Sequence, residues 1–329
     1  MAGSKVIFST HALHPDVTRD LQSLGDYRVS SAPTPDAILK ESAGAEIIVV
    51  RAKISPEIIA RERGLMACVR HGAGLDMIPM DAASQAGVLV ANVPGANATT
   101  VAEHVIWSAL ALLRKYPQVS CDLRASGWEP ARVHSNHGHE LSGRTIGILG
   151  AGNIGRRVAE MARHGFGCNV IALTRTPTTL PEWIEHVPFD QLLARSDILA
   201  LTCPLTSETQ GIIDRAAIAK MKQGAVLINV SRGQVTDEMA LAEALASGKL
   251  RGAAVDVFCQ QPLPPDHPFL ALHNVILTPH MAGITEESML RMGQGVVAET
   301  RRILSGKKPR NFCNPEVWER HRKRFGLPS

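Results

Sequence analysis

A glycine-rich turn near the middle of the chain constrains the fold more than any other feature. It follows an apolar run at 145–149 and precedes an amphipathic segment at 156–163. The turn consists of Gly150, Ala151, Gly152, Asn153, Ile154 and Gly155. A strand, a glycine turn and a helix in this order bring backbone N–H groups and the positive end of a helix dipole to one point, where they can hold a pyrophosphate. The stretch therefore predicts a dinucleotide site in a parallel α/β sheet.

The residues after the next apolar run bear on which dinucleotide is bound. The run at 169–173 is followed by Thr174, Arg175 and Thr176, where an acidic side chain normally takes the ribose hydroxyls. A carboxylate would repel a 2′-phosphate, whereas hydroxyls and a guanidinium group can bind it. We expect NADP as the cofactor, with NAD as the alternative.

Composition narrows the classes of partner. The chain has 329 residues, which suggests two domains of roughly 150 residues each. A net charge of +4 is too small to indicate nucleic-acid binding. The longest apolar run, Val105 to Leu113, is too short to span a bilayer. We therefore expect neither a nucleic acid nor a membrane as a partner.

Cysteine and histidine usage indicates the compartment and bears on metal binding. Six cysteines are scattered without C-x-x-C spacing, and the first ten residues lack a signal-peptide pattern, so we expect a cytoplasmic protein. His134, His137 and His139 have the spacing of a loose metal cluster, but they lie in a polar stretch without neighbouring Cys or Asp. No metal site is predicted.

Strand-like and helix-like segments alternate in two separate blocks. The first block, 5–93, predicts a small parallel α/β domain, and the second, 144–279, has six strand candidates typical of a doubly wound sheet. Because the glycine turn lies in mid-chain, the dinucleotide domain must be inserted in the first domain, and a helix at 286–304 can return the chain. We predict two Rossmann-like or flavodoxin-like domains: a discontinuous substrate domain at 1–103 and 292–329, and a nucleotide domain at 104–291.

Three segments of the second block place reactive side chains after predicted strands. Arg232 follows the strand predicted at 226–230, Asp256 and Gln261 lie at the end of the next, predicted at 253–258, and His280 follows the last. In a parallel sheet the carboxyl ends of the strands surround the ligand crevice, so these side chains should converge. Arg232 can clamp a carboxylate, and His280 is the best proton donor in the chain.

Taken in order, these and other motifs resemble the D-isomer-specific 2-hydroxyacid dehydrogenase family, most of all its NADP-using glyoxylate/hydroxypyruvate reductases. The resemblance covers nearly the whole chain. Besides the glycine turn, it rests on Gly72-Ala73-Gly74-Leu75-Asp76, Pro94-Gly95-Ala96-Asn97, Ala102-Glu103-His104, Cys203-Pro204-Leu205-Thr206, Ser231-Arg232-Gly233, Asp256-Val257-Phe258 and Pro279-His280.

The resemblance implies a role for each matching residue. Arg232 would bind the carboxylate of a small 2-oxo acid and polarise its keto oxygen, while the N–H groups of Ala73 and Gly74 hold the carboxylate's other side. His280 would protonate the oxygen as hydride arrives. The cofactor would also contact Cys203, Pro204, Val230, Asp256 and Gly283, with Asp256 facing the carboxamide. The resemblance further implies a homodimer in which the helix at 99–115 packs against the second subunit.

Gln261 departs from the family, because it stands where a glutamate normally pairs with the catalytic histidine. A neutral amide can orient the ring of His280 but adds no charge to stabilise imidazolium, so we predict a lower pH optimum for keto-acid reduction. Two alternatives stay open. Formate dehydrogenases of the superfamily carry Gln here and transfer hydride without a proton, and corepressors of the superfamily sense nucleotides on the same scaffold.

Charged residues near the predicted substrate loop bear on the size of the acid. Lys53, Arg70 and His71 border this loop and could bind a distal anion of a larger hydroxy acid. The alternative is that they are ordinary surface charges.

Overall fold

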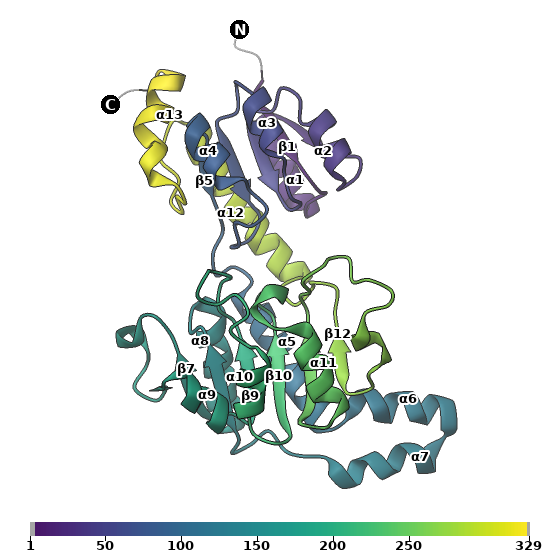
Figure 1. Cartoon of the computed structure of the whole chain (residues 1–329). Helices are drawn as coiled ribbons and strands as arrows, with labels where there is room; N and C mark the ends of the chain where they lie inside the picture. Colours follow the sequence, from purple (N-terminus) through teal and green to yellow (C-terminus); the bar gives the residue numbers. More distant parts are fainter. Residues whose placement is uncertain (1–3, 328–329) are drawn as a thin grey trace. The chain divides into compact units, whose positions relative to one another are not determined.

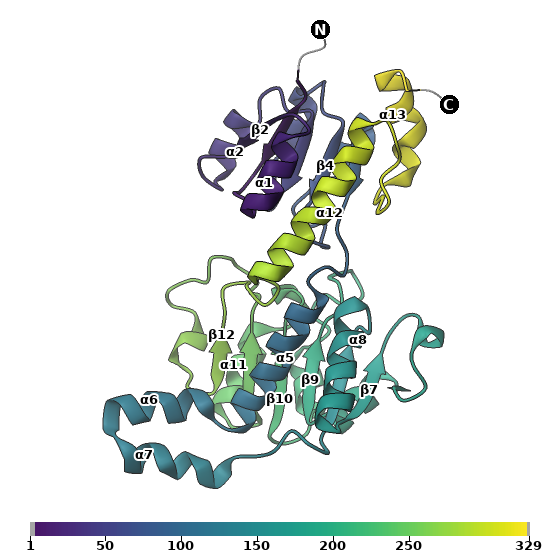
Figure 2. The same ribbon diagram turned by 180° about the vertical axis from the view of Figure 1, so that it is seen from behind.

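The computed structural model describes residues 4–327 and divides into two compact units. One unit combines Met1–Asn97 with Thr285–Ser329, and the other is Ala98–Ile284. Each is built on a parallel sheet with helices on both faces, which confirms the α/β prediction (Figures 1 and 2). The chain leaves the first unit after Asn97 and returns to it at Thr285.

The first unit has a five-stranded sheet in the order β2-β1-β3-β4-β5. Its strands are β1 (Val6–Ser9), β2 (Asp26–Val29), β3 (Ile47–Val50), β4 (Ala67–Arg70) and β5 (Leu89–Ala91). Its helices are α1 (Pro15–Gln22), α2 (Pro35–Glu41), α3 (Pro56–Arg61), α4 (Met80–Ala86), α12 (Glu286–Leu304) and α13 (Trp318–Phe325). Helices α1 and α12 lie together on one face of the sheet (Figure 2). The return helix α12 begins at a capping box between Thr285 and Ser288, which satisfies two backbone N–H groups at the helix start.

The second unit has a seven-stranded sheet in the order β12-β11-β10-β9-β6-β7-β8, with every strand pair parallel. Its strands are β6 (Thr145–Leu149), β7 (Asn169–Leu173), β8 (Glu185–His186), β9 (Ile198–Leu201), β10 (Ala225–Asn229), β11 (Leu250–Val255) and β12 (Val275–Leu277). Its helices include α5 (Ala98–Leu113), α8 (Asn153–Glu160), α9 (Phe189–Arg195), α10 (Arg215–Lys220) and α11 (Glu238–Ala246). Helices α5 and α8 cover one face, and α9, α10 and α11 cover the other (Figures 1 and 2).

Two details of this sheet differ from the sequence prediction. The six predicted strands omit β8, because its two residues are exposed and carry no apolar pattern. The strand predicted at 253–258 starts and ends three residues earlier, as β11. Residues Asp256 to Phe258 are buried like a strand, but they form the turn that follows it.

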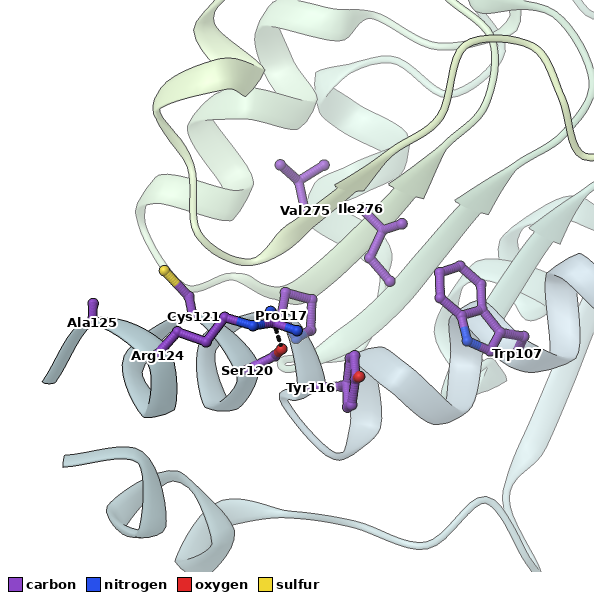
Figure 3. Close-up of a pocket in the computed structure, with 9 residues that line it drawn as sticks. All are labelled: Trp107, Tyr116, Pro117, Ser120, Cys121, Arg124, Ala125, Val275 and Ile276. Atoms are coloured by element: carbon purple, nitrogen blue, oxygen red, sulfur yellow. Dashed lines mark hydrogen bonds between the residues drawn. The ribbon is translucent and has the colours of Figure 1, made fainter. Parts of the chain in front are cut away.

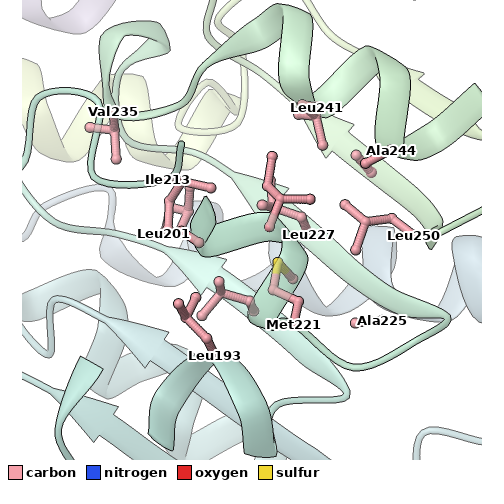
Figure 4. Packing of buried hydrophobic residues seen from close by; sticks show 14 of the residues in the cluster. Leu193, Leu201, Ile213, Met221, Ala225, Leu227, Val235, Leu241, Ala244 and Leu250 are labelled. Carbon is pink, nitrogen blue, oxygen red and sulfur yellow. The ribbon is translucent and has the colours of Figure 1, made fainter. Parts of the chain in front are cut away.

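A close-packed core holds the strands of the second unit in register. Leu201 and Leu227, from neighbouring strands, pack with Leu193 of α9 and Leu241 of α11, and all are at most 1% exposed (Figure 4). Full burial of a leucine side chain stabilises a fold by roughly 1.5–3 kcal/mol. Such a core keeps the carboxyl ends of the strands, where the candidate site lies, in defined positions.

Residues 116–137 form an arm that the sequence analysis does not anticipate. Helices α6 (Tyr116–Ser126) and α7 (Trp128–Val133) and a 3₁₀ turn (His134–His137) extend from the β12 side of the unit (Figure 1). The description of His134 as lacking a nearby aspartate is wrong, since its Nε2 lies 2.7 Å from Asp122 across the arm. Sequence separation hides this pair, because it forms only once α6 and α7 fold back on each other.

Residues 4–327 contain no group of three or more His, Cys, Asp or Glu side chains arranged to hold a metal ion. In the same range, no helix has both the length and the apolar character needed to cross a membrane.

Candidate active site at the carboxyl ends of the strands

The glycine turn is fixed by close packing on one side and open on the other. Gly150 has a φ of +98°, and a Cβ there would lie 2.6 Å from the backbone of Cys203. A Cβ on Gly155 would lie 2.4 Å from the carbonyl oxygen of Gly150, so α8 packs directly against the turn. A Cβ on Gly152, by contrast, would meet nothing within 4 Å. The turn thus presents bare backbone, at the start of α8, to open space.

That open space is a pocket of about 860 Å³. It brings together many of the residues predicted to bind the cofactor: Gly150, Gly152, Asn153, Thr174, Arg175, Thr176, Cys203 and Pro204. Five others lie outside its lining: Ile154, Gly155, Val230, Asp256 and Gly283. Backbone N–H groups at a helix start, beside hydroxyls and a guanidinium group, form a donor set that fits a phosphate-bearing dinucleotide.

Arg156 is a pocket residue that the sequence analysis missed. Its Nε donates to the carbonyl of Ala151 at 3.1 Å, and its far end bonds the hydroxyl of Thr179, which donates to the carbonyl of Thr176 at 2.8 Å. Within residues 4–327 no acidic side chain pairs with Arg156 or Arg175, whereas the adjacent Arg157 pairs with Glu160. Helical phase is the missing signal, since it turns only one of two successive arginines toward the pocket.

The turn after β12, which carries His280, is held by the buried carboxylate of Asp256. Oδ1 of Asp256 accepts from the Thr278 hydroxyl at 2.6 Å and from the N–H of Met281 at 2.8 Å, and Oδ2 accepts from the N–H of Ala282 at 2.9 Å. The N–H of His280 donates to the backbone carbonyl of Asp256 at 2.8 Å. These bonds hold His280 at a φ of +54°, in the left-handed region. Asp256 therefore closes this turn; its predicted contact with a carboxamide stays a prediction.

The predicted contact between Gln261 and His280 is formed. Nδ1 of His280 lies 3.1 Å from Oε1 of Gln261, and Nε2 of Gln261 donates to the carbonyl of Phe258 at 3.3 Å. An amide oxygen only accepts, so the proton in this contact belongs to Nδ1 of His280. Gln261 thus orients the imidazole without contributing a negative charge.

Arg232 begins the turn after β10, next to the turn that leads to Gln261. Its guanidinium donates to the carbonyl of Ser231 at 2.7 Å, and its own carbonyl accepts from the amide of Asn229 at 3.0 Å. A Cβ on Gly233 would lie 2.1 Å from the carbonyl carbon of Phe258, so the two turns pack backbone to backbone. The predicted trio therefore sits on the turns that follow three adjacent strands, β10, β11 and β12.

In the first unit, Ala73 and Gly74 lie in a loop after β4. Their carbonyls accept from Asn92 at 2.8 Å and from Nε of Arg70 at 3.0 Å. Among the described residues, the N–H groups of Ala73 and Gly74 donate to no protein acceptor, which suits them for an anion. Arg70 also donates to the carbonyls of Val50 and His71, so its guanidinium anchors this loop.

Other basic groups gather at the same sheet edge. Arg51 follows β3, and His11 and His71 follow β1 and β4. Burial, and after it the charges of Arg51 and Arg70, lower the pKa of His71 to about 4, and the same causes lower the pKa of His11. Nε2 of the buried His71 has no hydrogen-bond partner among the described residues. Arg51 and His11 were missed by the sequence analysis, although their positions directly after strands were the available signal.

Comparison with known proteins gives a consistent result. Residues 106–282 match the model of the D-isomer specific 2-hydroxyacid dehydrogenase NAD binding domain. A D-3-phosphoglycerate dehydrogenase of Methanocaldococcus jannaschii is 37% identical over 94% of the chain, but the match spans only 59% of that enzyme. A glyoxylate/hydroxypyruvate reductase B of Pectobacterium carotovorum is 37% identical over 80% of this chain and 84% of that one.

Solved structures are similar over nearly the full chain. The NADPH-dependent glyoxylate/hydroxypyruvate reductase of Sinorhizobium meliloti, in complex with citrate, matches with a TM-score of 0.83 and 26% identity, covering 94% of this chain and 99% of that one.

Proposed function

We propose that this chain, which belongs to the D-isomer-specific 2-hydroxyacid dehydrogenase family, reduces a small 2-oxo acid to the D-2-hydroxy acid with NADPH. The observation that carries the proposal is the hydrogen bond between His280 and Gln261, at the sheet edge that also holds the glycine-turn pocket. Formate oxidation, the alternative, transfers hydride without a substrate proton, and formate dehydrogenases of the superfamily carry the same Gln beside the histidine. The choice between the two reactions therefore rests on the end of β7, where Thr174, Arg175 and Thr176 replace the acidic side chain that formate dehydrogenases typically keep to select NAD.

NADPH, when bound, supplies the hydride, and the chain's own side chains manage the acid and the proton. Arg232 clamps the substrate carboxylate and polarises the keto oxygen. The imidazolium of His280, held through Nδ1 by Gln261, donates its Nε2 proton to that oxygen and becomes neutral. In the reverse direction neutral His280 accepts the hydroxyl proton.

The preference for NADPH over NADH is supported by the charges in the pocket. Thr174, Arg175 and Thr176 line it without a carboxylate at the position that would repel a 2′-phosphate, and Arg156 adds a second guanidinium group. Calorimetric titration of the protein with 2′,5′-ADP and with 5′-ADP tests this preference without turnover. We expect tighter binding of 2′,5′-ADP; equal or weaker binding would refute the NADPH assignment.

A second candidate substrate is a 2-oxo acid with a second anionic group. Arg51 and Arg70 act electrostatically on His11 and His71, and none of the causes that shift these two histidines is an acidic side chain. A relative of this chain is named D-3-phosphoglycerate dehydrogenase, a protein whose substrate carries a phosphate. Arg51 is the better placed of the two arginines to meet such a group, because Arg70 is engaged with three backbone carbonyls.

A substrate panel separates these functions. NADPH and NADH oxidation should be followed with glyoxylate, hydroxypyruvate, pyruvate and 3-phosphohydroxypyruvate, and formate should be tested with NADP⁺ and NAD⁺. We expect the highest kcat/KM with NADPH and one of the 2-oxo acids. Formate turnover alone would establish the hydride-only alternative, and NADPH binding without any turnover would establish a nucleotide sensor.

We also propose that the partner of the arm is a second copy of this chain. A pocket of about 640 Å³ lies between α6, Trp107 of α5 and the edge strand β12 (Figure 3). Trp107 is 49% exposed, Tyr116 57% and Trp128 65%, and no residue of α6 is buried. Apolar exposure of this extent marks an interaction surface, and a closed dimer would cover the same patch on both copies.

Light scattering after gel filtration tests the dimer. We expect twice the mass of the 35.4 kDa chain for the unmodified protein. In Trp128→Glu we expect the mass to shift toward that of a single chain. A monomer at micromolar concentration in the unmodified protein would reject the proposal. Residence in the cytoplasm, which the scattered cysteines suggested, stays a prediction.

A further inference from the structure

The turn that carries Gln261 is tied at both ends by one side chain, that of Glu238. Glu238 opens α11, and its side chain is only 13% exposed. Oε1 accepts from the N–H of Cys259 at 2.8 Å, while Oε2 lies 3.4 Å from Nε2 of His267. One carboxylate therefore holds residues on both sides of Gln261.

Other contacts make this turn rigid on the α11 side. The amide of Gln234 donates to the carbonyl of Cys259 at 3.2 Å, so both backbone groups of Cys259 are held by side chains from the start of α11 and the turn before it. The carbonyl of Phe258 in turn accepts from Nε2 of Gln261. Because that carbonyl can only accept, it turns Oε1 of Gln261 toward His280 and prevents the amide from flipping.

We propose that Glu238 is a positioning residue for proton transfer: it fixes the turn at 259–267, which holds Gln261 in the orientation that keeps the proton of His280 on Nδ1. The proposal rests on the proposed reductase function for its kinetic part only. Glu238 touches neither substrate nor the reacting atoms in this scheme and acts through Cys259 and Gln261.

The adjacent thiol does not offer a competing chemical role. Burial, together with the charge of Glu238, raises the pKa of Cys259 to about 11, so the thiol stays protonated at neutral pH. A thiol of this kind is a weak nucleophile. The carboxylate is thus a structural acceptor here and not the base of a cysteine centre.

The tautomer of His280 is the direct readout. Protein labelled with ¹⁵N in histidine reports the tautomer by NMR, and the variant His280→Asn assigns the signal. We expect neutral His280 to be protonated on Nδ1 in the unmodified protein and a mixture of tautomers in Glu238→Ala. Glu238→Gln should restore the single tautomer, since its amide oxygen can still accept from the N–H of Cys259.

Kinetics provide the second readout. General acid catalysis contributes about 10²–10⁴-fold, so partial loss of orientation should lower kcat of Glu238→Ala about tenfold, with the affinity for NADPH unchanged. Glu243→Ala is the matched control, because Glu243 lies on the same helix and forms an exposed pair with Arg215. Thermal unfolding of each variant identifies any general loss of stability.

The outcomes separate this proposal from the reductase function. An unchanged tautomer and kcat in Glu238→Ala, or equal impairment of Glu238→Gln and Glu238→Ala, would overturn the positioning role. If the unmodified protein turns over no 2-oxo acid while Glu238→Ala still mixes the tautomers, the reductase function fails and the positioning role stands.

Discussion

The two parallel sheets of this chain have the same architecture, yet their carboxyl edges carry different chemistry. In the second unit the strands end in a glycine turn, a clamped arginine and an oriented histidine. In the first unit they end in loops that carry Arg51, Arg70 and two histidines, and Arg70 bonds the carbonyl of Gly74. The doubly wound sheet determines where a ligand site lies, at the carboxyl ends of its strands. The residues directly after each strand determine what that site can do.

The histidines at the two edges lie in different environments. The carboxyl edge of the sheet in the first unit is called the first edge here, and that of the second unit the second edge. His280 is held by an amide oxygen that accepts from Nδ1, so a hydrogen bond orients its ring without adding a charge. His71 is 3% exposed and near two guanidinium groups, so its neutral form is favoured and its pKa falls to about 4. The arrangement at His280 suits a proton donor. The arrangement at His71 suits an uncharged side chain that lines an anion site.

The largest effect is expected when the second edge loses its proposed proton donor, His280. His280→Asn keeps a residue that tolerates positive φ, so the turn should stay folded while general acid catalysis is lost. We expect kcat for 2-oxo acid reduction to fall about 10²–10⁴-fold, with the Kd for NADPH unchanged. If kcat at saturating substrate falls less than threefold, His280 does not transfer the proton. The proposed contrast between the two edges would then be wrong as well.

Acid should destabilise the first edge through His71. Its pKa is about 4 in the fold and near 6.5 when unfolded, so the unfolded chain binds the extra proton between these values. The contribution of His71 to the free energy of unfolding is complete above pH 6.5, and it falls by up to about 3 kcal/mol as the pH drops to 4. Urea unfolding of His71→Leu should lack this part of the decline, whereas His186→Gln, at an exposed histidine, should keep it.

Two glycines of the second edge should respond differently to alanine. In Gly155→Ala the new Cβ meets the carbonyl of Gly150, and overpacking of this kind costs roughly 1–3 kcal/mol, so the melting temperature of the free protein should fall. Gly152→Ala should melt like the unmodified protein but bind NADPH more weakly, since its Cβ enters open pocket. Equal melting of the two variants would contradict the division of the turn into a packed side and a ligand side.

Cofactor choice should follow the end of β7. Thr174→Asp restores a carboxylate at the position that takes the ribose hydroxyls, and it should shift the NADPH/NADH ratio of kcat/KM toward NADH about tenfold or more. Arg157→Met is the control, because Arg157 pairs with Glu160 instead of lining the pocket. An unchanged ratio in Thr174→Asp would show that selectivity lies elsewhere.

The smallest effect is expected at the first edge. Arg51→Met should raise KM for a 2-oxo acid with a second anionic group about tenfold, the value of one charge-assisted hydrogen bond, and leave KM for glyoxylate unchanged. Lys53→Met, at a neighbouring exposed position, should change neither constant. If both variants behave alike, the first edge holds surface charge and no second anion subsite.

The elements that the sequence predicts best are those whose conformation depends on residues within one short segment. The glycine turn, the strands around it and the helix at Glu286–Leu304 follow from local periodicity, turn chemistry and capping. Sequence reasoning missed the short strand β8 and the arm of α6 and α7, which lack a strong apolar pattern because their residues stay exposed. The end of β11 was misjudged because Val257 and Phe258 are buried in a turn and imitate a strand.

The sequence by itself determined the class of fold, the cofactor-type turn and the identity of the residues at the strand ends, because order along a parallel sheet makes such positions predictable. Only the tertiary structure decided which groups those residues contact. Glu238 and Cys259 are 21 positions apart, and Arg156 and Thr179 are 23 apart. Spacing carries no signal for such pairs, since they meet only when separate crossovers pack on one sheet.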